Sequence, residues 1–146
     1  MKFKNDLIYG QNAENAFLER FPHLTKTDGR TGDFITPSGK ILELKSDRHD
    51  PRIFRNLIME RYSRMGVDGG PWQAKSHNCE LFVYDFPKYG QIYVFDVNKL
   101  VEELETIVKV NELPLFTIDN GTHVTHYYKI KINYLTDINL GVGAIC

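Results

Sequence analysis

An acid, a tight turn and a second acid inside an apolar run constrain the fold of this sequence most strongly. They lie in residues 33–46, where two apolar segments flank Pro, Ser and Gly at residues 37–39. This pattern predicts two strands joined by a turn. Successive side chains of a strand alternate between its faces, so Glu43 and Lys45 point the same way. The segment therefore predicts a hairpin that brings Asp33 close to Glu43.

The register of this hairpin depends on the length of its turn. A three-residue turn places Asp33 directly opposite Glu43, and a two-residue turn shifts the pairing by one residue. Two carboxylates this close repel each other unless a cation lies between them. Oxygen ligands of this kind suit Mg²⁺ or Mn²⁺. Lys45 follows roughly 7 Å along the strand, from where its ammonium can reach a phosphate oxygen or an attacking water near the metal.

Length and composition are those of a globular protein and predict one domain over residues 1–146. The formal net charge is −1, so any basic surface has to be local. Cys79 and Cys146 form no C-x-x-C pair, which argues against a zinc knuckle or a disulfide framework. Residues 1–6 lack the apolar core of a signal peptide, and no segment is long and apolar enough to span a membrane. These features predict a cytoplasmic protein.

A helix is predicted over residues 10–21, because its apolar residues recur at helical spacing and Pro22 ends the pattern. One face of this helix carries Ala13, Phe17, Leu18 and Phe21. Glu14 falls within that apolar face, whereas Glu19 lies on the opposite side. An acid on an inward face is a candidate functional residue.

Residues 51–65 fit either a helix or a strand. A helix would carry Arg61 and Arg64 within its buried arc, whereas a strand over 56–62 alternates in the usual way, so we favour the strand. Residues 66–78 read as a loop with one helical turn at 72–75.

The remaining elements define the expected fold class. A second amphipathic helix is predicted over residues 97–110. The expected strands cover residues 33–36, 40–46, 56–62, 80–85, 91–96 and 127–134. This order predicts an α+β domain with a central mixed β-sheet flanked by helices.

The arrangement of Asp33, nine residues, Glu43, Leu44 and Lys45 resembles the PD-(D/E)XK nuclease superfamily. The resemblance implies a restriction-endonuclease-like fold in which Asp33 and Glu43 bind the metal and the Leu44 carbonyl adds a ligand. It also implies that an acid from the preceding helix, here Glu14, completes a catalytic set with Lys45. Gly32 stands where the superfamily usually has Pro.

Local charge points to DNA as the partner. Between Lys45 and Arg64 there are six basic and three acidic residues, a balance that suits the phosphate backbone. The candidate DNA-binding residues are Arg48, Arg61, Gln73 and Lys75. Glu60 and His77 have no assigned role, although the resemblance would put Glu60 on the next strand near the site.

The sequence thus predicts a Mg²⁺-dependent endodeoxyribonuclease. Its length leaves no room for a separate recognition domain, which favours DNA structure or ends as the target, as for a Holliday junction resolvase, or a homodimer across a duplex. A compact enzyme of this kind would suit a phage acting in its host cell. The alternatives are an inactive nuclease-like accessory module that binds DNA or protein, and a hydrolase of small phosphodiesters.

Overall fold

The first helix, α1, covers Lys2–Arg20 in the computed structural model, which describes the backbone of residues 2–146 and the side chains of residues 8–146. The prediction began this helix at Gly10, which was wrong. Gly10 is intrinsically a poor helix residue, but it lies in the interior of α1. The helix ends close to the predicted end at Phe21.

A mixed sheet forms the centre of the molecule, as the sequence predicted. Its strands lie in the order β1-β2-β3-β6-β7. They are β1 Thr25–Lys26, β2 Phe34–Ile35, β3 Ile41–Ser46, β6 Leu81–Phe86 and β7 Gln91–Asp96. Strands β3 and β6 pair in parallel, and the other neighbours are antiparallel. The two predicted hairpins, β2–β3 and β6–β7, are confirmed.

A second, antiparallel sheet has the order β5-β4-β9-β8. Its strands are β4 Asn56–Arg64, β5 Val67–Asp68, β8 Phe116–Asp119 and β9 Val124–Lys131. The strand interpretation of residues 56–62 is confirmed. The prediction of a strand to residue 134 was wrong, because Ile132–Tyr134 form a 3₁₀ turn. Lys131 pairs with Asn56, where β4 begins, so no partner strand remains beyond it.

Three more α-helices connect and cover these sheets. They are α2 Pro51–Phe54, α3 Gly70–Ser76 and α4 Val97–Asn111. The predicted helix over 97–110 is confirmed, and Asp96 caps it by accepting a hydrogen bond from the Lys99 amide at 2.9 Å. The helical turn predicted at 72–75 lies inside α3.

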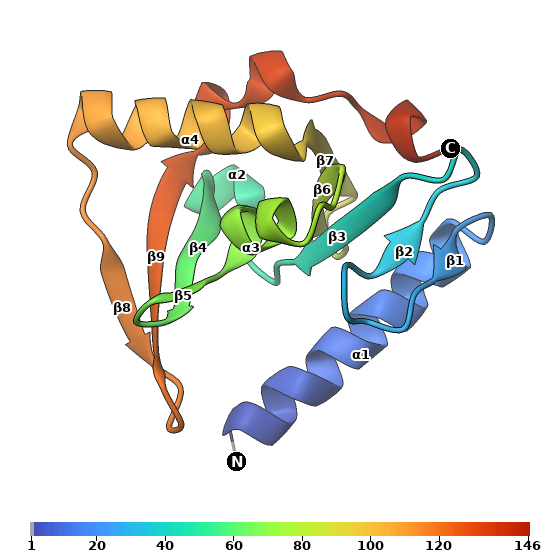
Figure 1. Cartoon of the computed structure of the whole chain (residues 1–146), viewed down its shortest axis with the longest axis horizontal. Helices are drawn as coiled ribbons and strands as arrows, with labels where there is room; N and C mark the ends of the chain where they lie inside the picture. The colour runs from blue at the N-terminus through green and yellow to red at the C-terminus, as the bar shows by residue number, and fades with distance from the viewer. Residues whose placement is uncertain (1) are drawn as a thin grey trace.

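The mixed sheet lies between α1 on one side and α4 on the other (Figure 1). The core on the α1 side contains Phe17, Leu24, Phe34, Leu42, Leu81, Val83, Val94 and Ile145. The core on the α4 side joins the two sheets and includes Leu57, Met59, Trp72, Phe82, Phe95, Leu100, Leu104 and Ile130. Among the residues that the structure describes, no helix has the length and apolar character needed to cross a bilayer. The prediction that residues 1–6 lack the apolar core of a signal peptide depends on side chains outside the described residues.

A buried hydroxyl group ties the two sheets together. Tyr84 of β6 donates a hydrogen bond from its hydroxyl to the buried carboxylate of Asp47, which follows β3. The same hydroxyl accepts a hydrogen bond from the amide of Ile58 in β4 at 2.9 Å. The end of β3, the middle of β6 and the start of β4 are therefore held at one point.

Tyr84→Phe tests this link between the sheets. It leaves the Ile58 amide without its acceptor and removes a donor from Asp47, so we expect the free energy of unfolding to fall by about 1–3 kcal/mol. Urea denaturation measures the change. Tyr93→Phe is the matched control, since its half-buried hydroxyl donates only to Gln91, and it should cost less. Equal losses in the two variants would contradict the role given to Tyr84.

Candidate metal centre

The β2–β3 hairpin brings Asp33, just before β2, beside Glu43 of β3. Phe34 pairs with Leu42, and the Asp33 amide donates to the Leu42 carbonyl at 2.8 Å, which corresponds to the three-residue turn. Gly32, just before the acid, has a φ of +111°, and a Cβ there would lie 2.6 Å from Cγ2 of Ile41. Proline holds φ near −65°. Proline therefore could not adopt the backbone conformation of position 32.

The Asp33 carboxylate is fixed by the backbone of the adjacent strand. Its Oδ2 accepts a hydrogen bond from the Leu44 amide at 2.8 Å. One oxygen is thus held in place while the carboxylate faces the second acid of the hairpin, Glu43. A carboxylate oriented in this way is suited to bind a cation without first losing side-chain freedom.

Glu14 reaches the same place from α1. Its carboxyl group lies beside that of Asp33, and Nζ of Lys26 lies 3.9 Å from its Oε2. Burial and the neighbouring Asp33 raise the pKa of Glu14 to about 7, although Lys26 acts in the opposite direction. Glu14 therefore binds a proton more readily than an ordinary glutamate where no cation is bound.

Glu43 completes a cluster of three carboxyl groups. Burial, followed by the negative charges of Asp33 and Glu14, raises the pKa of Glu43 to about 8. Beneath the cluster, burial and the charge of Glu43 also raise the pKa of the Cys79 thiol to about 11. Three carboxyl groups this close together form a site where a divalent cation would be strongly attracted.

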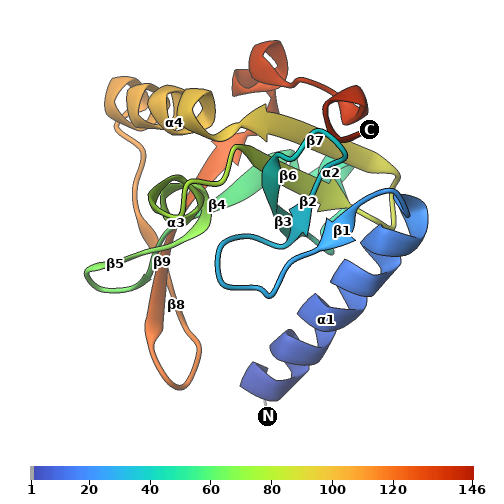
Figure 2. The ribbon, with the colours of Figure 1, turned by 45° about the vertical axis from the view of Figure 1, so that its right-hand side comes forward.

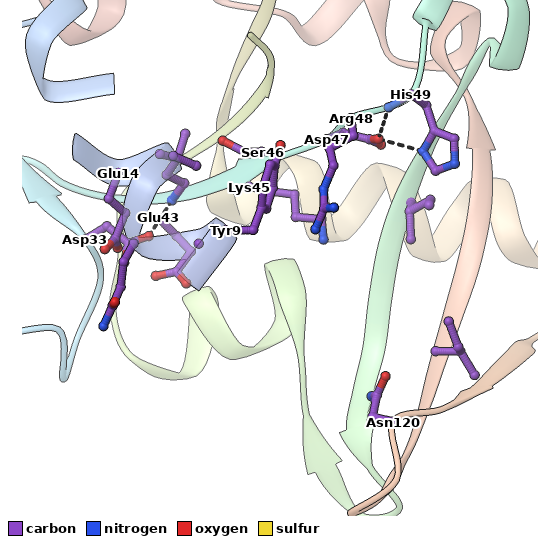
Figure 3. A pocket seen from close by; sticks show the side chains of 16 residues that line it. Tyr9, Glu14, Asp33, Glu43, Lys45, Ser46, Asp47, Arg48, His49 and Asn120 are labelled. Atoms are coloured by element: carbon purple, nitrogen blue, oxygen red, sulfur yellow. Dashed lines mark hydrogen bonds and ion pairs between the residues drawn. The ribbon is translucent and has the colours of Figure 1, made fainter. Parts of the chain in front are cut away.

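The cluster opens into a cavity of about 820 Å³ (Figure 3). Lys45 lies beside the carboxylates in this view, with Ser46, Asp47, Arg48 and His49 following it along the chain. Lys45 is exposed, whereas the Ser46 hydroxyl is buried and lacks a hydrogen-bond partner among the described residues. The cavity therefore combines acids at one end with cations along its length.

The far wall of the cavity comes from the second sheet. Ile58 of β4 and Ile118 and Asn120 of the β8–β9 hairpin line it. The amino-terminal half of α1 and the tip of this hairpin extend to the same side of the molecule in both views (Figure 2). Sequence reasoning missed this wall, because nothing local in residues 116–124 indicates which strand they face.

Tyr9, Asp47 and His49 also line the cavity, and the sequence did not identify them as site residues. The guanidinium of Arg48 lies 3.7 Å from the ring centre of Tyr9, a close cation–π contact. Asp47, which is buried, accepts hydrogen bonds from the His49 amide at 2.8 Å and from the His49 ring nitrogen Nδ1 at 2.6 Å. Tyr9 could have been found, since it lies on the same helix as Glu14. The pairing of His49 with Asp47 has no separate sequence signal.

The structure separates the predicted site residues into two groups. Glu14, Asp33, Glu43, Lys45 and Arg48 all line the same cavity. The other predicted DNA-binding residues, Arg61, Gln73 and Lys75, do not line it. Their role as DNA contacts stays a prediction.

Arg61 instead has partners within the fold. Its guanidinium donates to Asp68 at 2.8 Å and lies 4.4 Å and 4.8 Å from the ring centres of Tyr62 and Trp72. Glu60 also lies outside the cavity, and a Cβ on Gly69 would approach its Cγ to 2.6 Å. His77 is exposed at the end of α3.

The donor chemistry of the cluster fits Mg²⁺ or Mn²⁺, which prefer carboxylate oxygens. In the part of the chain that the structure describes, no three His, Cys, Asp or Glu side chains already form a metal-binding group. Glu14, Asp33 and Glu43 are the residues that would hold the ion. Binding would compete with the protons that Glu14 and Glu43 retain at their raised pKa values.

No protein-family model, no curated protein and no solved structure matches this chain.

The raised pKa values predict how stability changes with pH. Without metal, the folded state binds more protons than the unfolded chain from the ordinary glutamate pKa of 4.5 up to about 8, the pKa of Glu43. The free energy of unfolding should therefore fall as the pH rises through this window. Thermal unfolding in the presence of EDTA should give a lower Tm at about pH 8 than at about pH 5.5.

Glu43→Gln should flatten this pH dependence, because it removes the group with the higher pKa. Glu103→Gln removes a carboxylate from the surface of α4 and serves as the control. Mn²⁺ should raise the Tm more at the higher pH, where it competes with fewer protons. An unchanged pH dependence in Glu43→Gln would contradict the pKa argument.

Proposed function

We propose that this protein is a Mg²⁺- or Mn²⁺-dependent endodeoxyribonuclease that hydrolyses phosphodiester bonds in DNA. The observation that carries the proposal is the convergence of Glu14, Asp33 and Glu43, with Lys45 beside them, in one open cavity. The resemblance to the PD-(D/E)XK superfamily supports the same reading. It predicts these four residues from the sequence, and they come from two separate elements of the fold.

Each residue has a definite task in this proposal. Asp33 and Glu43 bind the ion, and Glu14 contributes a third carboxylate from α1. When bound, the ion would polarise the phosphate and lower the pKa of a coordinated water. Lys45 extends from the same face of β3 as Glu43, where its ammonium orients the attacking water and stabilises negative charge that develops on the phosphate.

DNA is the favoured substrate because of the position of Arg48 and the open shape of the cavity. Arg48 lies on the cavity wall and supplies a cation for the phosphate backbone. The cavity is open between α1 and the β8–β9 hairpin, which leaves space for an extended strand. A target chosen by structure, such as a junction, or cleavage by a homodimer across a duplex, is part of this proposal.

An inactive nuclease-like accessory module is the second candidate. The observation that favours it is the lack, among the described residues, of three ligands already placed for a metal. Calorimetric titration with Mn²⁺ separates the two. Binding that disappears in Asp33→Asn supports the enzyme, and absence of binding at this site supports the inactive module.

Cleavage assays test the enzyme directly. Purified protein with Mg²⁺ or Mn²⁺ should cleave at least one of duplex, single-stranded or branched DNA. Glu43→Gln and Lys45→Met should each lower the rate by on the order of 100-fold or more, because each removes an interaction with the ion or the developing charge. Glu80→Gln, an exposed acid outside the cavity, should leave the rate near that of the parent protein. Full activity in the Glu43 and Lys45 variants, or no cleavage of any DNA, would refute the proposal.

A further inference from the structure

A second cavity, of about 520 Å³, lies next to the first and differs from it in charge. Nine residues line it: Pro51, Arg52, Arg55, Asn56, Gln91, Tyr93, Lys131, Ile132 and Asn133. Three are cations and none is an acid, whereas the first cavity is lined by four acids. In a chain with a net charge of −1, this is a local concentration of positive charge.

The three cations differ in whether an acidic side chain pairs with them. Arg52 is neutralised by Asp50, which accepts hydrogen bonds from its Nε at 3.0 Å and its NH2 at 2.8 Å. Arg55 donates only to a backbone carbonyl, that of Arg52. Lys131 lies 5.7 Å from the ring centre of Tyr134. Within the described part of the chain, neither Arg55 nor Lys131 has an acidic partner, and both are exposed.

The backbone holds these two cations in place. Arg55 adopts a left-handed conformation with φ of 57°, which is unusual for a side chain of this size. Its amide donates to the Pro51 carbonyl at 3.1 Å, and its carbonyl accepts from the Ile132 amide at 3.1 Å. Lys131 is the neighbour of Ile132 and pairs with Asn56 across the strands. The ends of helix α2 and strand β9 are thus hydrogen bonded to each other at the positions from which the Arg55 and Lys131 side chains extend.

The walls of the two cavities are close along the chain at two places. His49 lines the first cavity and Pro51 the second, with only Asp50 between them, and Ile58 lines the first and Asn56 the second, with only Leu57 between them. A polyanion that passes Arg48 and His49 in the first cavity therefore comes within reach of Arg55 and Lys131. Amide and hydroxyl groups in the second cavity, such as those of Asn133 and Tyr93, add hydrogen bonds suited to phosphate oxygens.

We propose that this second cavity binds a backbone phosphate of a DNA strand whose neighbouring segment lies in the carboxylate cavity. This assignment rests on the proposed function for its substrate. It adds a positioning site, formed by Arg55 and Lys131, that contributes affinity and no base selectivity.

The test measures DNA binding by fluorescence anisotropy of a labelled oligonucleotide, in EDTA to prevent cleavage, at several salt concentrations. Arg55→Asn keeps a residue that tolerates the left-handed backbone, and Lys131→Gln changes an exposed side chain, so both variants should fold. The double variant should bind about tenfold more weakly and lower the salt dependence by about one counterion for each lost charge. Lys109→Ala, an exposed cation at the end of α4, should change neither value.

Unchanged affinity and salt dependence in the double variant would overturn the proposal, as would a parent protein that does not bind DNA. A calorimetric titration with inorganic phosphate provides a second arm. Binding of phosphate that requires Arg55 and Lys131, with DNA affinity unaffected, would assign the cavity to a free anion and also overturn the DNA proposal.

The outcomes for the two proposals can be separated. DNA binding that depends on Arg55 and Lys131 without any cleavage would remove the enzyme and keep the phosphate site. Cleavage that depends on Glu43, with DNA binding indifferent to the double variant, would keep the enzyme and remove the phosphate site.

Discussion

The register of the β2–β3 hairpin is the constraint on which the site depends. Side chains alternate along a strand, so a shift of one residue would carry Asp33 to the other face and bring Phe34 out of the core. Phe34 is fully buried against α1, which makes that shift costly. Gly32 adds to the constraint, because its backbone conformation and close contact with Ile41 leave no room for a side chain. Hydrophobic burial on one face of the hairpin therefore fixes the carboxylates on the other.

The clustered carboxyl groups lower the stability of the fold when no cation is present, yet they are the groups that would bind one. Burial alone disfavours a charged Glu43, and the acids beside it increase the cost. Without a cation the fold lowers this cost by retaining protons, as the raised pKa values of Glu14 and Glu43 indicate. A site that is destabilised when empty and relieved when filled is common where a protein binds a metal. The same repulsion that weakens the fold would supply affinity for the ion.

Local signals explain what the sequence predicted well. The turn at residues 37–39, the helix over 97–110 and the alternation in 56–62 each depend on neighbours along the chain. The second sheet could not be predicted in this way, because the pairing of β4 with β9 joins Leu57 to Ile130 across a long stretch of sequence. For the same reason, Ile118 and Asn120 were not recognised as cavity residues. Arg61 lies outside the cavity because it packs between aromatic rings, which its charge alone does not reveal.

The segment after β3 connects these separate features. Asp47 accepts a hydrogen bond from the Tyr84 hydroxyl, which itself accepts one from the Ile58 amide of β4. The Arg55 carbonyl accepts a hydrogen bond from the amide of Ile132, the residue that follows β9. Asp50 lies between these points and neutralises Arg52. Since His49 and Pro51 line different cavities, this segment forms the boundary between an acidic and a basic site. The net charge of −1 sums all the charged residues of the chain, so composition alone does not reveal this local separation of acidic and basic sites.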